Sequence, residues 1–171
     1  MDLNKKNIVL IGMMGAGKST IGYLLSKAID LKFIDIDKII EKEAGLKIQS
    51  IFEKKGENYF RNLEEKITLK ILKSKRKIIS LGGGGFLNKN IKKETLINSI
   101  SFWLNWKSST LIKRIYKSKK RPLAFHSNES DLKKLIIERS KTYSEANFKI
   151  NCESSTKNMI VNQIKNLYAK N

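Results

Sequence analysis

Gly12-Met13-Met14-Gly15-Ala16-Gly17-Lys18-Ser19 is the stretch of sequence that decides the fold of this chain. It fits the pattern G-x-x-x-x-G-K-[ST], and Thr20 follows it. That pattern requires a strand before the loop and a helix after it. An apolar, strand-like run occupies residues 7–12, and residues 18–29 carry apolar side chains at helical spacing. Both requirements are met, so the sequence predicts a loop that binds nucleotide phosphates.

The residue types in this phosphate loop, residues 12–19, suit that task. Glycines let backbone N–H groups turn inward around phosphate oxygens, and the start of the following helix adds its positive end. Lys18 can reach the β- and γ-phosphates, and the Ser19 hydroxyl can bind Mg²⁺. We therefore expect Mg²⁺ as cofactor and ATP contacts along one continuous run: Gly15, Ala16, Gly17, Lys18, Ser19 and Thr20.

The rest of the chain alternates short apolar runs with amphipathic helices. Strands are expected at 7–12, 33–35, 77–81, 100–104 and 148–150, and helices at 18–29, 37–44, 49–55, 57–74, 91–96, 108–116, 131–146 and 156–169. This alternation predicts an α/β P-loop kinase fold, with a five-stranded parallel sheet flanked by helices on both faces. We expect one domain over residues 1–171, with functional residues beyond the carboxyl ends of the strands.

A phosphate loop alone does not distinguish a switch GTPase from a small-molecule kinase. A GTPase needs an Asn-Lys-x-Asp string to read guanine, and the nearest string, Asn88-Lys89-Asn90-Ile91, lacks the aspartate. No aspartate in the sequence has glycine three residues later, so an Asp-x-x-Gly switch is missing too. The sequence therefore favours a kinase that acts on a small acceptor.

Charge and composition set further bounds on the function. The formal net charge of +19 raises the possibility of a basic nucleic-acid-binding NTPase. The lysines are scattered rather than grouped with aromatic residues, so we expect no nucleic-acid partner. The N-terminal apolar run is too short for a signal peptide, and no apolar stretch is long enough to span a membrane. We expect a cytoplasmic monomer in which the single cysteine, Cys152, has a structural role.

Two aspartates follow the second expected strand. If the strand continues through Asp37, then Asp35 and Asp37 point to the same side, toward the phosphate loop. One carboxylate could order Mg²⁺ through water, and the other could orient or deprotonate an acceptor hydroxyl. The alternative is that Asp37 only caps the following helix.

Other candidate residues carry positive charge or lack a side chain. Arg61 could bind a substrate or form an ordinary helical pair with Glu65, and Arg139 could bind a substrate or lie on a solvated helix face. The glycine loop, residues 82–85, follows the third expected strand and would let a ligand lie against bare backbone. Arg121 lies in a basic loop that contains Pro122, and it could close over ATP.

Taken together and in this order, the motifs resemble those of the shikimate kinase family across essentially the whole chain. The matching residues are the run 12–20, Asp35-x-Asp37, Gly56-Glu57-x-x-Phe60-Arg61-x-x-Glu64, Leu81-Gly82-Gly83-Gly84, Arg121-Pro122-Leu123, and Arg139 followed by Tyr143. The resemblance implies transfer of the ATP γ-phosphoryl group to the 3-hydroxyl of shikimate, on the route to chorismate and aromatic amino acids. Other small P-loop kinases, for gluconate or a nucleoside monophosphate, are the nearest alternatives.

The resemblance also implies roles for individual residues. Shikimate would be bound by Asp37, Arg61, Gly83, Gly84 and Arg139. Catalysis would rest on Lys18, Asp37 and Arg121, and Mg²⁺ on Ser19 directly and Asp35 through water. Arg114 resembles the arginine that stacks on adenine in some members, and with Arg121 it completes the expected ATP contacts. A mobile lid is expected at about 113–128, and a shikimate-binding helical segment at about 36–64.

Overall fold

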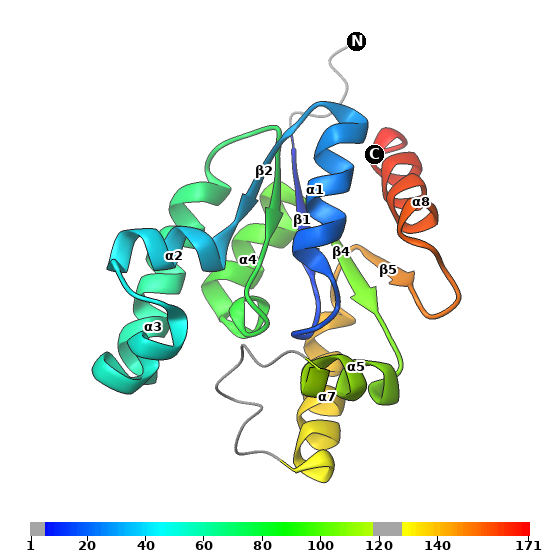
Figure 1. The fold of residues 1–171 in the computed structure, drawn as a ribbon. Helices are drawn as coiled ribbons and strands as arrows, with labels where there is room; N and C mark the ends of the chain where they lie inside the picture. Colours follow the sequence, from blue (N-terminus) through cyan, green and yellow to red (C-terminus); the bar gives the residue numbers. More distant parts are fainter. Residues whose placement is uncertain (1–5, 118–127) are drawn as a thin grey trace.

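The computed structural model describes residues 6–117 and 128–171, and Figure 1 shows their arrangement. The strands are β1 (Asn7–Ile11), β2 (Lys32–Asp35), β3 (Lys77–Ser80), β4 (Ser99–Asn105) and β5 (Phe148–Asn151). The helices are α1 (Lys18–Ile29), α2 (Ile36–Ala44), α3 (Ile48–Leu72), the short η1 (Gly85–Leu87), α4 (Lys89–Asn98), α5 (Ser108–Lys117), α7 (Glu129–Tyr143) and α8 (Lys157–Ala169).

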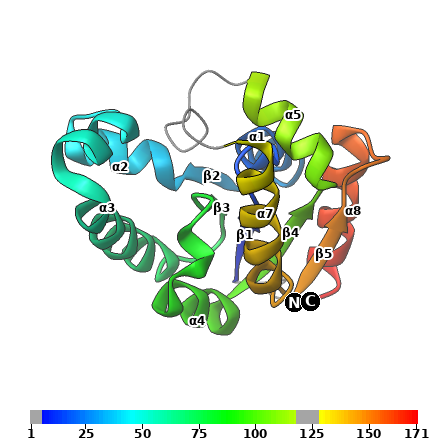
Figure 2. The same ribbon diagram turned by 90° about the horizontal axis from the view of Figure 1, so that it is seen from below.

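The strands form one parallel sheet in the order β2-β3-β1-β4-β5, as expected. β1 is central and buried along its whole length, with Ile8 beside Ile78 on one side and Ile100 on the other. The carboxyl ends of the strands meet at one edge of the sheet, onto which Figure 2 looks. In a parallel sheet of this kind, ligands bind beyond that edge.

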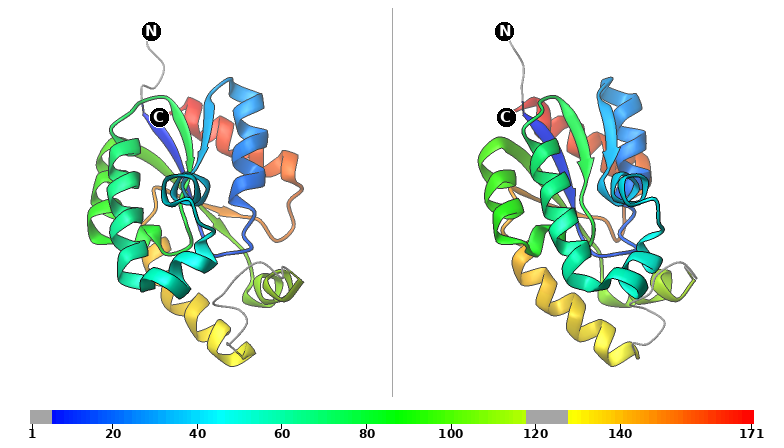
Figure 3. Two further views of the ribbon diagram at one scale, coloured as in Figure 1. Left: turned by 60° about the vertical axis from the view of Figure 1, so that its left-hand side comes forward. Right: turned by 90° about the vertical axis from the view of Figure 1, so that its left-hand side faces the viewer.

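Helices cover both faces of the sheet, as Figure 3 shows. α1 packs against α8 on one face, and α3 packs against α4 on the other. Both faces of a sheet covered in this way are mainly apolar, which explains the continuous apolar run of β1 from Ile8 to Ile11 and the buried Phe102, Trp103 and Leu104 of β4. The α/β P-loop kinase fold expected from the sequence is therefore confirmed.

Two local details refine the expectations. α3 runs across Gly56, whose backbone (φ 82°, ψ 167°) is not helical, so the helical segments before and after it meet at a kink. The break expected at this glycine is present, because a residue without Cβ adopts positive φ at little cost. No helix in residues 6–117 and 128–171 is both long and apolar enough to cross a membrane.

The strand expected at 33–35 and the helix expected at 37–44 are both present, but the suggestion that Asp37 shares a strand face with Asp35 is wrong. β2 ends at Asp35, and Asp37 lies in the first turn of α2. Asp35 is the residue that caps this helix, because its side chain accepts a hydrogen bond from the Asp37 backbone N–H at 3.1 Å. The two aspartates therefore face the site from different elements, and the suggestion that Asp37 is the cap is also wrong.

Candidate active site

The phosphate loop leaves β1 and enters α1 through glycines in the left-handed region. Gly15 has φ 80° and Gly17 has φ 86°, values that other residues reach only with strain. Lys18 is largely buried, and its ammonium donates to the carbonyls of Gly12 at 2.7 Å and Met13 at 3.1 Å. The ammonium thus lies over the loop itself, at the place where phosphates would be bound.

Oxygen ligands for a metal stand beside this loop. The Ser19 hydroxyl, at the start of α1, donates to Oδ2 of Asp35 at 2.5 Å, and Ser19 is exposed to solvent. The other carboxylate oxygen of Asp35 holds the start of α2, which fixes the orientation of the group. A hydroxyl and a carboxylate are the oxygen donors that Mg²⁺ prefers, and both are accessible here.

The glycine loop leaves β3 and is surrounded by the side chains expected to bind the acceptor. A Cβ built on Gly84 would overlap the Arg61 guanidinium, and one on Gly83 would lie 3.6 Å from Nη1 of Arg139. A Cβ on Gly82 would lie 2.8 Å from Oδ1 of Asp37 and 2.6 Å from Oε1 of Glu64. Charged groups from α2, α3 and α7 therefore meet over bare backbone, next to the phosphate loop.

Neither arginine has the environment that the sequence suggested as an alternative to substrate binding, which was a pair with Glu65 for Arg61 and a solvated helix face for Arg139. Arg61 pairs with Glu64 at 2.7 Å and with Glu57 at 3.1 Å, whereas Glu65 accepts hydrogen bonds from two asparagines near α4. Residue 65 is one position further around the helix than residue 64, so it faces α4 instead of the site. Arg139 does not lie on a solvated face, because its Nε is buried and its Nη1 contacts the Met13 sulfur.

Glu64 was not singled out from the sequence, although it belongs to the matching motif. Its side chain is 2% exposed, and within residues 6–117 and 128–171 its Oε1 has no hydrogen-bond partner. Burial raises the pKa of the Glu64 carboxyl, and Asp37 adds to this, while Arg61 and Arg139 oppose it. The folded chain thus binds the Glu64 proton more tightly than the unfolded chain does.

This shift predicts how stability depends on pH. Because the pKa of Glu64 is raised on folding from an ordinary value of 4.5, its ionisation costs folding free energy as pH rises above that value. In the Glu64→Gln variant the cost is absent. Denaturant unfolding between pH 4 and pH 8 should show the parent losing stability relative to the variant as pH increases. If the parent instead gained stability relative to the variant as pH increased, the raised pKa of Glu64 would be contradicted.

Tyr143 is a second residue of the matching motifs to which the sequence alone assigns no role. Its hydroxyl donates to the Gly83 carbonyl, and its ring packs against Trp103. Burial raises the pKa of this phenol to about 12, so it stays protonated and can keep donating. Its position four residues after Arg139 on α7, hence on the same helix face, is the signal that could have identified it.

Arg114 contacts the phosphate loop, and Thr20 directly follows it. The Arg114 guanidinium stacks on the Trp106 ring at 3.7 Å and donates to the Gly15 carbonyl at 3.4 Å. Thr20 is exposed on the first turn of α1. Arg121, with Pro122 and Leu123, lies outside the described residues, as do positions 118–127 of the expected lid.

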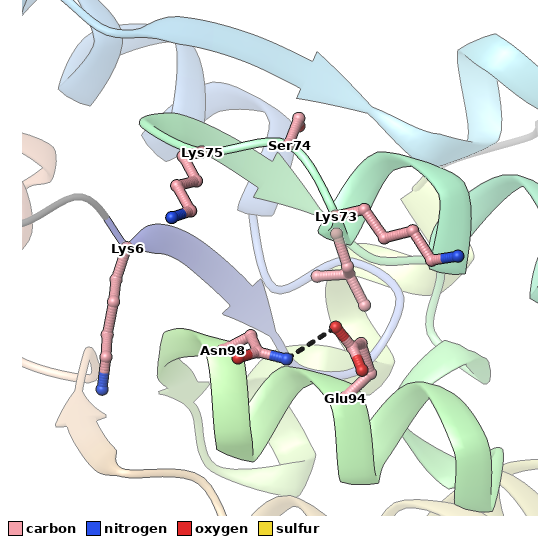
Figure 4. A pocket seen from close by; sticks show the side chains of 7 residues that line it. Lys6, Lys73, Ser74, Lys75, Glu94 and Asn98 are labelled. Carbon is pink, nitrogen blue, oxygen red and sulfur yellow. Dashed lines mark hydrogen bonds between the residues drawn. The ribbon is translucent and has the colours of Figure 1, made fainter.

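A hollow of about 410 Å³ lies at the opposite edge of the sheet, beside the amino ends of β1, β3 and β4. It is lined by Lys6, Leu72, Lys73, Ser74, Lys75, Glu94 and Asn98. Figure 4 shows the Lys6 and Lys73 side chains pointing away from each other, and Asn98 bonded to Glu94. Its charged groups do not converge, in contrast to those around the glycine loop.

The chain is similar in sequence and in fold to known proteins. The protein-family model described as shikimate kinase matches residues 14–169 of this chain. A shikimate kinase of Sulfurihydrogenibium sp. is 41% identical over 159 residues, which are 93% of this chain and 95% of that protein. The solved structure of a shikimate kinase from Acinetobacter baumannii in complex with shikimate has a TM-score of 0.90 at 31% identity, covering 95% of this chain and 92% of that one. The enzyme from Aquifex aeolicus gives 0.84 at 34% identity, with 96% of each chain covered.

Proposed function

Because this chain belongs to the shikimate kinase family, we propose that the residues around its phosphate loop and glycine loop form the catalytic centre for the phosphorylation of shikimate. The chain is an ATP-dependent kinase that transfers the γ-phosphoryl group to the 3-hydroxyl of shikimate. The products are shikimate 3-phosphate and ADP, on the route to chorismate and aromatic amino acids. What remains to be assigned is the role of each residue.

The observation that carries the proposal is the meeting of two carboxylates, Asp37 and Glu64, and two guanidinium groups, Arg61 and Arg139, over the glycine loop. Arg61 and Arg139 bind the carboxylate of shikimate, because a guanidinium fork matches a carboxylate in two parallel hydrogen bonds. Asp37 binds the ring hydroxyls and orients or deprotonates the one that attacks. Gly83 and Gly84 let the ring approach the backbone, which a side chain at either position would obstruct.

The nucleotide side uses the phosphate loop. Gly15, Ala16, Gly17, Lys18, Ser19 and Thr20 contact ATP, and Lys18 offsets the charge of the transferring phosphoryl group. Ser19 and Asp35 hold Mg²⁺, the latter through water. When bound, the ion would supply positive charge that offsets the negative charge developing during transfer. The roles of Arg114 at adenine and of Arg121 in a lid at about 113–128 stay predictions.

One assay tests the substrate directly. ADP release should be measured with a coupled enzyme system while shikimate, gluconate and nucleoside monophosphates are offered in turn. We expect turnover with shikimate and only background release with the others. The expected monomeric state stays a prediction, which light scattering would test. DNA binding across a salt series tests the expected absence of a nucleic-acid partner, and the cytoplasmic location stays a prediction.

Arg61 and Arg139 give a quantitative test of the acceptor site. A hydrogen bond to a charged group is worth about 1.5–3 kcal/mol, so Arg61→Ala or Arg139→Ala should weaken shikimate binding by about ten- to a hundredfold. Affinity for ATP should hardly change. Lysine at either position should restore only part of the loss, because an ammonium cannot supply the fork. Titration calorimetry with shikimate and with ATP measures both affinities.

Glu57→Gln is the matched control for Arg61. Glu57 occupies the Nε and Nη2 edge of the guanidinium at the exposed rim. If Arg61→Ala acted only by breaking this helical pair, Glu57→Gln would weaken shikimate binding equally. We expect no such loss, because the Nε and Nη2 edge of Arg61 then becomes available to the substrate carboxylate. Parent-like shikimate affinity in both arginine variants would overturn the acceptor-site assignment.

A further inference from the structure

Four carbonyl groups of the phosphate loop, those of Gly12, Met13, Gly15 and Ala16, accept hydrogen bonds from side chains. Lys18 holds those of Gly12 and Met13, and Arg114 contacts that of Gly15. The Ala16 carbonyl accepts a hydrogen bond from the indole N–H of Trp106 at 3.0 Å, across 90 positions of sequence. Since a buried carbonyl costs free energy unless it is bonded, these contacts favour one conformation of the loop.

The bond to Ala16 determines where the next N–H group points. A trans peptide unit is planar, and its C=O and N–H groups lie on opposite sides. With the Ala16 carbonyl held toward Trp106, the N–H of Gly17 must face the other way, away from Trp106. Gly17 directly precedes α1, where N–H groups and the helix dipole together bind anions.

Trp106 itself is fixed on both sides. It follows β4 directly, where the carbonyl of Asn105 accepts from the Cys152 N–H at 2.9 Å. The N–H of Lys107 donates to Glu153 at 3.0 Å, which secures the start of α5. The face of the indole ring carries the Arg114 guanidinium at 3.7 Å. Trp106 therefore has little freedom to move, and it can hold the loop in one position.

We infer that Trp106 is a positioning residue for ATP, because its indole N–H holds the Ala16 carbonyl and thereby keeps the Gly17 N–H directed at the phosphates. This inference rests on the proposed nucleotide site and extends it to a residue outside the phosphate-loop motif. Trp106 acts through the loop, and it acts on the phosphate chain of the nucleotide instead of the base.

Two variants separate the hydrogen bond from the ring. Trp106→Phe keeps an aromatic face for Arg114 but removes the N–H, whereas Trp106→His places Nε2 where the indole nitrogen stood. Loss of one hydrogen bond should raise the KM for ATP in Trp106→Phe by about three- to tenfold, with the KM for shikimate unchanged. Trp106→His should stay closer to the parent. Inorganic tripolyphosphate and adenosine, used as inhibitors competitive with ATP, report on the phosphate and base parts separately.

We expect the inhibition constant of tripolyphosphate to rise with the KM for ATP, and that of adenosine to stay constant. Ile164→Val, in the buried face of α8, serves as a control that lowers the melting temperature without touching the loop. The inference is overturned by a parent-like KM for ATP in Trp106→Phe, by equal losses in both variants, by a rise for adenosine alone, or by parallel increases for ATP and shikimate. Absence of shikimate-dependent ADP release in the parent chain would instead contradict the proposed function.

Discussion

Replacing Lys18 with alanine should reduce phosphoryl transfer by about a hundred- to a thousandfold, because one preorganised donor to transition-state charge is worth two to three orders of magnitude. The structure adds a second cause. The ammonium also ties the carbonyls of Gly12 and Met13 together, so the variant loses part of the support of the phosphate loop. Affinity for ATP should fall along with the turnover number. Single-turnover kinetics with ATP and shikimate measures the chemical step directly.

The same contacts change what the variant does to stability. Lys18 is buried, so its removal leaves two carbonyl groups with weaker partners and costs about 1–3 kcal/mol. Lys18→Met keeps much of the volume while removing the charge, and it should be as inactive as Lys18→Ala. Lys165→Ala, at an exposed position on α8, controls for loss of a positive charge in general. Activity of Lys18→Ala within about tenfold of the parent would remove the residue from the catalytic group.

Local signals in the sequence were sufficient for the fold. The phosphate loop identified the junction of β1 and α1, and Gly56 marked the kink inside α3. Glycine departs from helical geometry at low cost, so its effect is readable without knowledge of the rest of the chain. The resemblance supplied residues on α2, α3 and α7 that the structure then brings together around the glycine loop.

The sequence was less informative where a long-range contact or a helix boundary decides the outcome. The end of β2 at Asp35 was predicted, but the identity of the helix cap was not, because Asp35 belongs to the strand and caps the helix at the same time, which apolar alternation does not indicate. Glu64 and Glu65 differ only by one position around α3, so only the packing of that helix shows which one faces Arg61. Trp106 carries no local signal, because its hydrogen bond reaches a loop far away in sequence.

The boundary at β2 sharpens the expectation for Asp37. Since Asp35 is the cap, Asp37→Asn leaves the capping bond intact, as that bond uses only the Asp37 backbone N–H. The variant loses one negative charge in the first helical turn, which is worth about 0.3–1 kcal/mol at an exposed position. The neutral amide is a poor proton acceptor, so turnover should fall by about a hundred- to ten-thousandfold if Asp37 acts as general base.

Asp35→Asn distinguishes the base from the metal site. Asparagine caps a helix nearly as well as aspartate, so both variants should melt within a few degrees of the parent. The Asp35 variant lacks a charge beside Ser19, and raising Mg²⁺ should restore part of its activity, whereas the Asp37 variant should stay inactive at every Mg²⁺ concentration. Steady-state rates over a Mg²⁺ series, with melting curves alongside, make the comparison. Parent-like turnover of a folded Asp37→Asn variant would leave Asp37 as a substrate ligand at most and would require another base near the glycine loop.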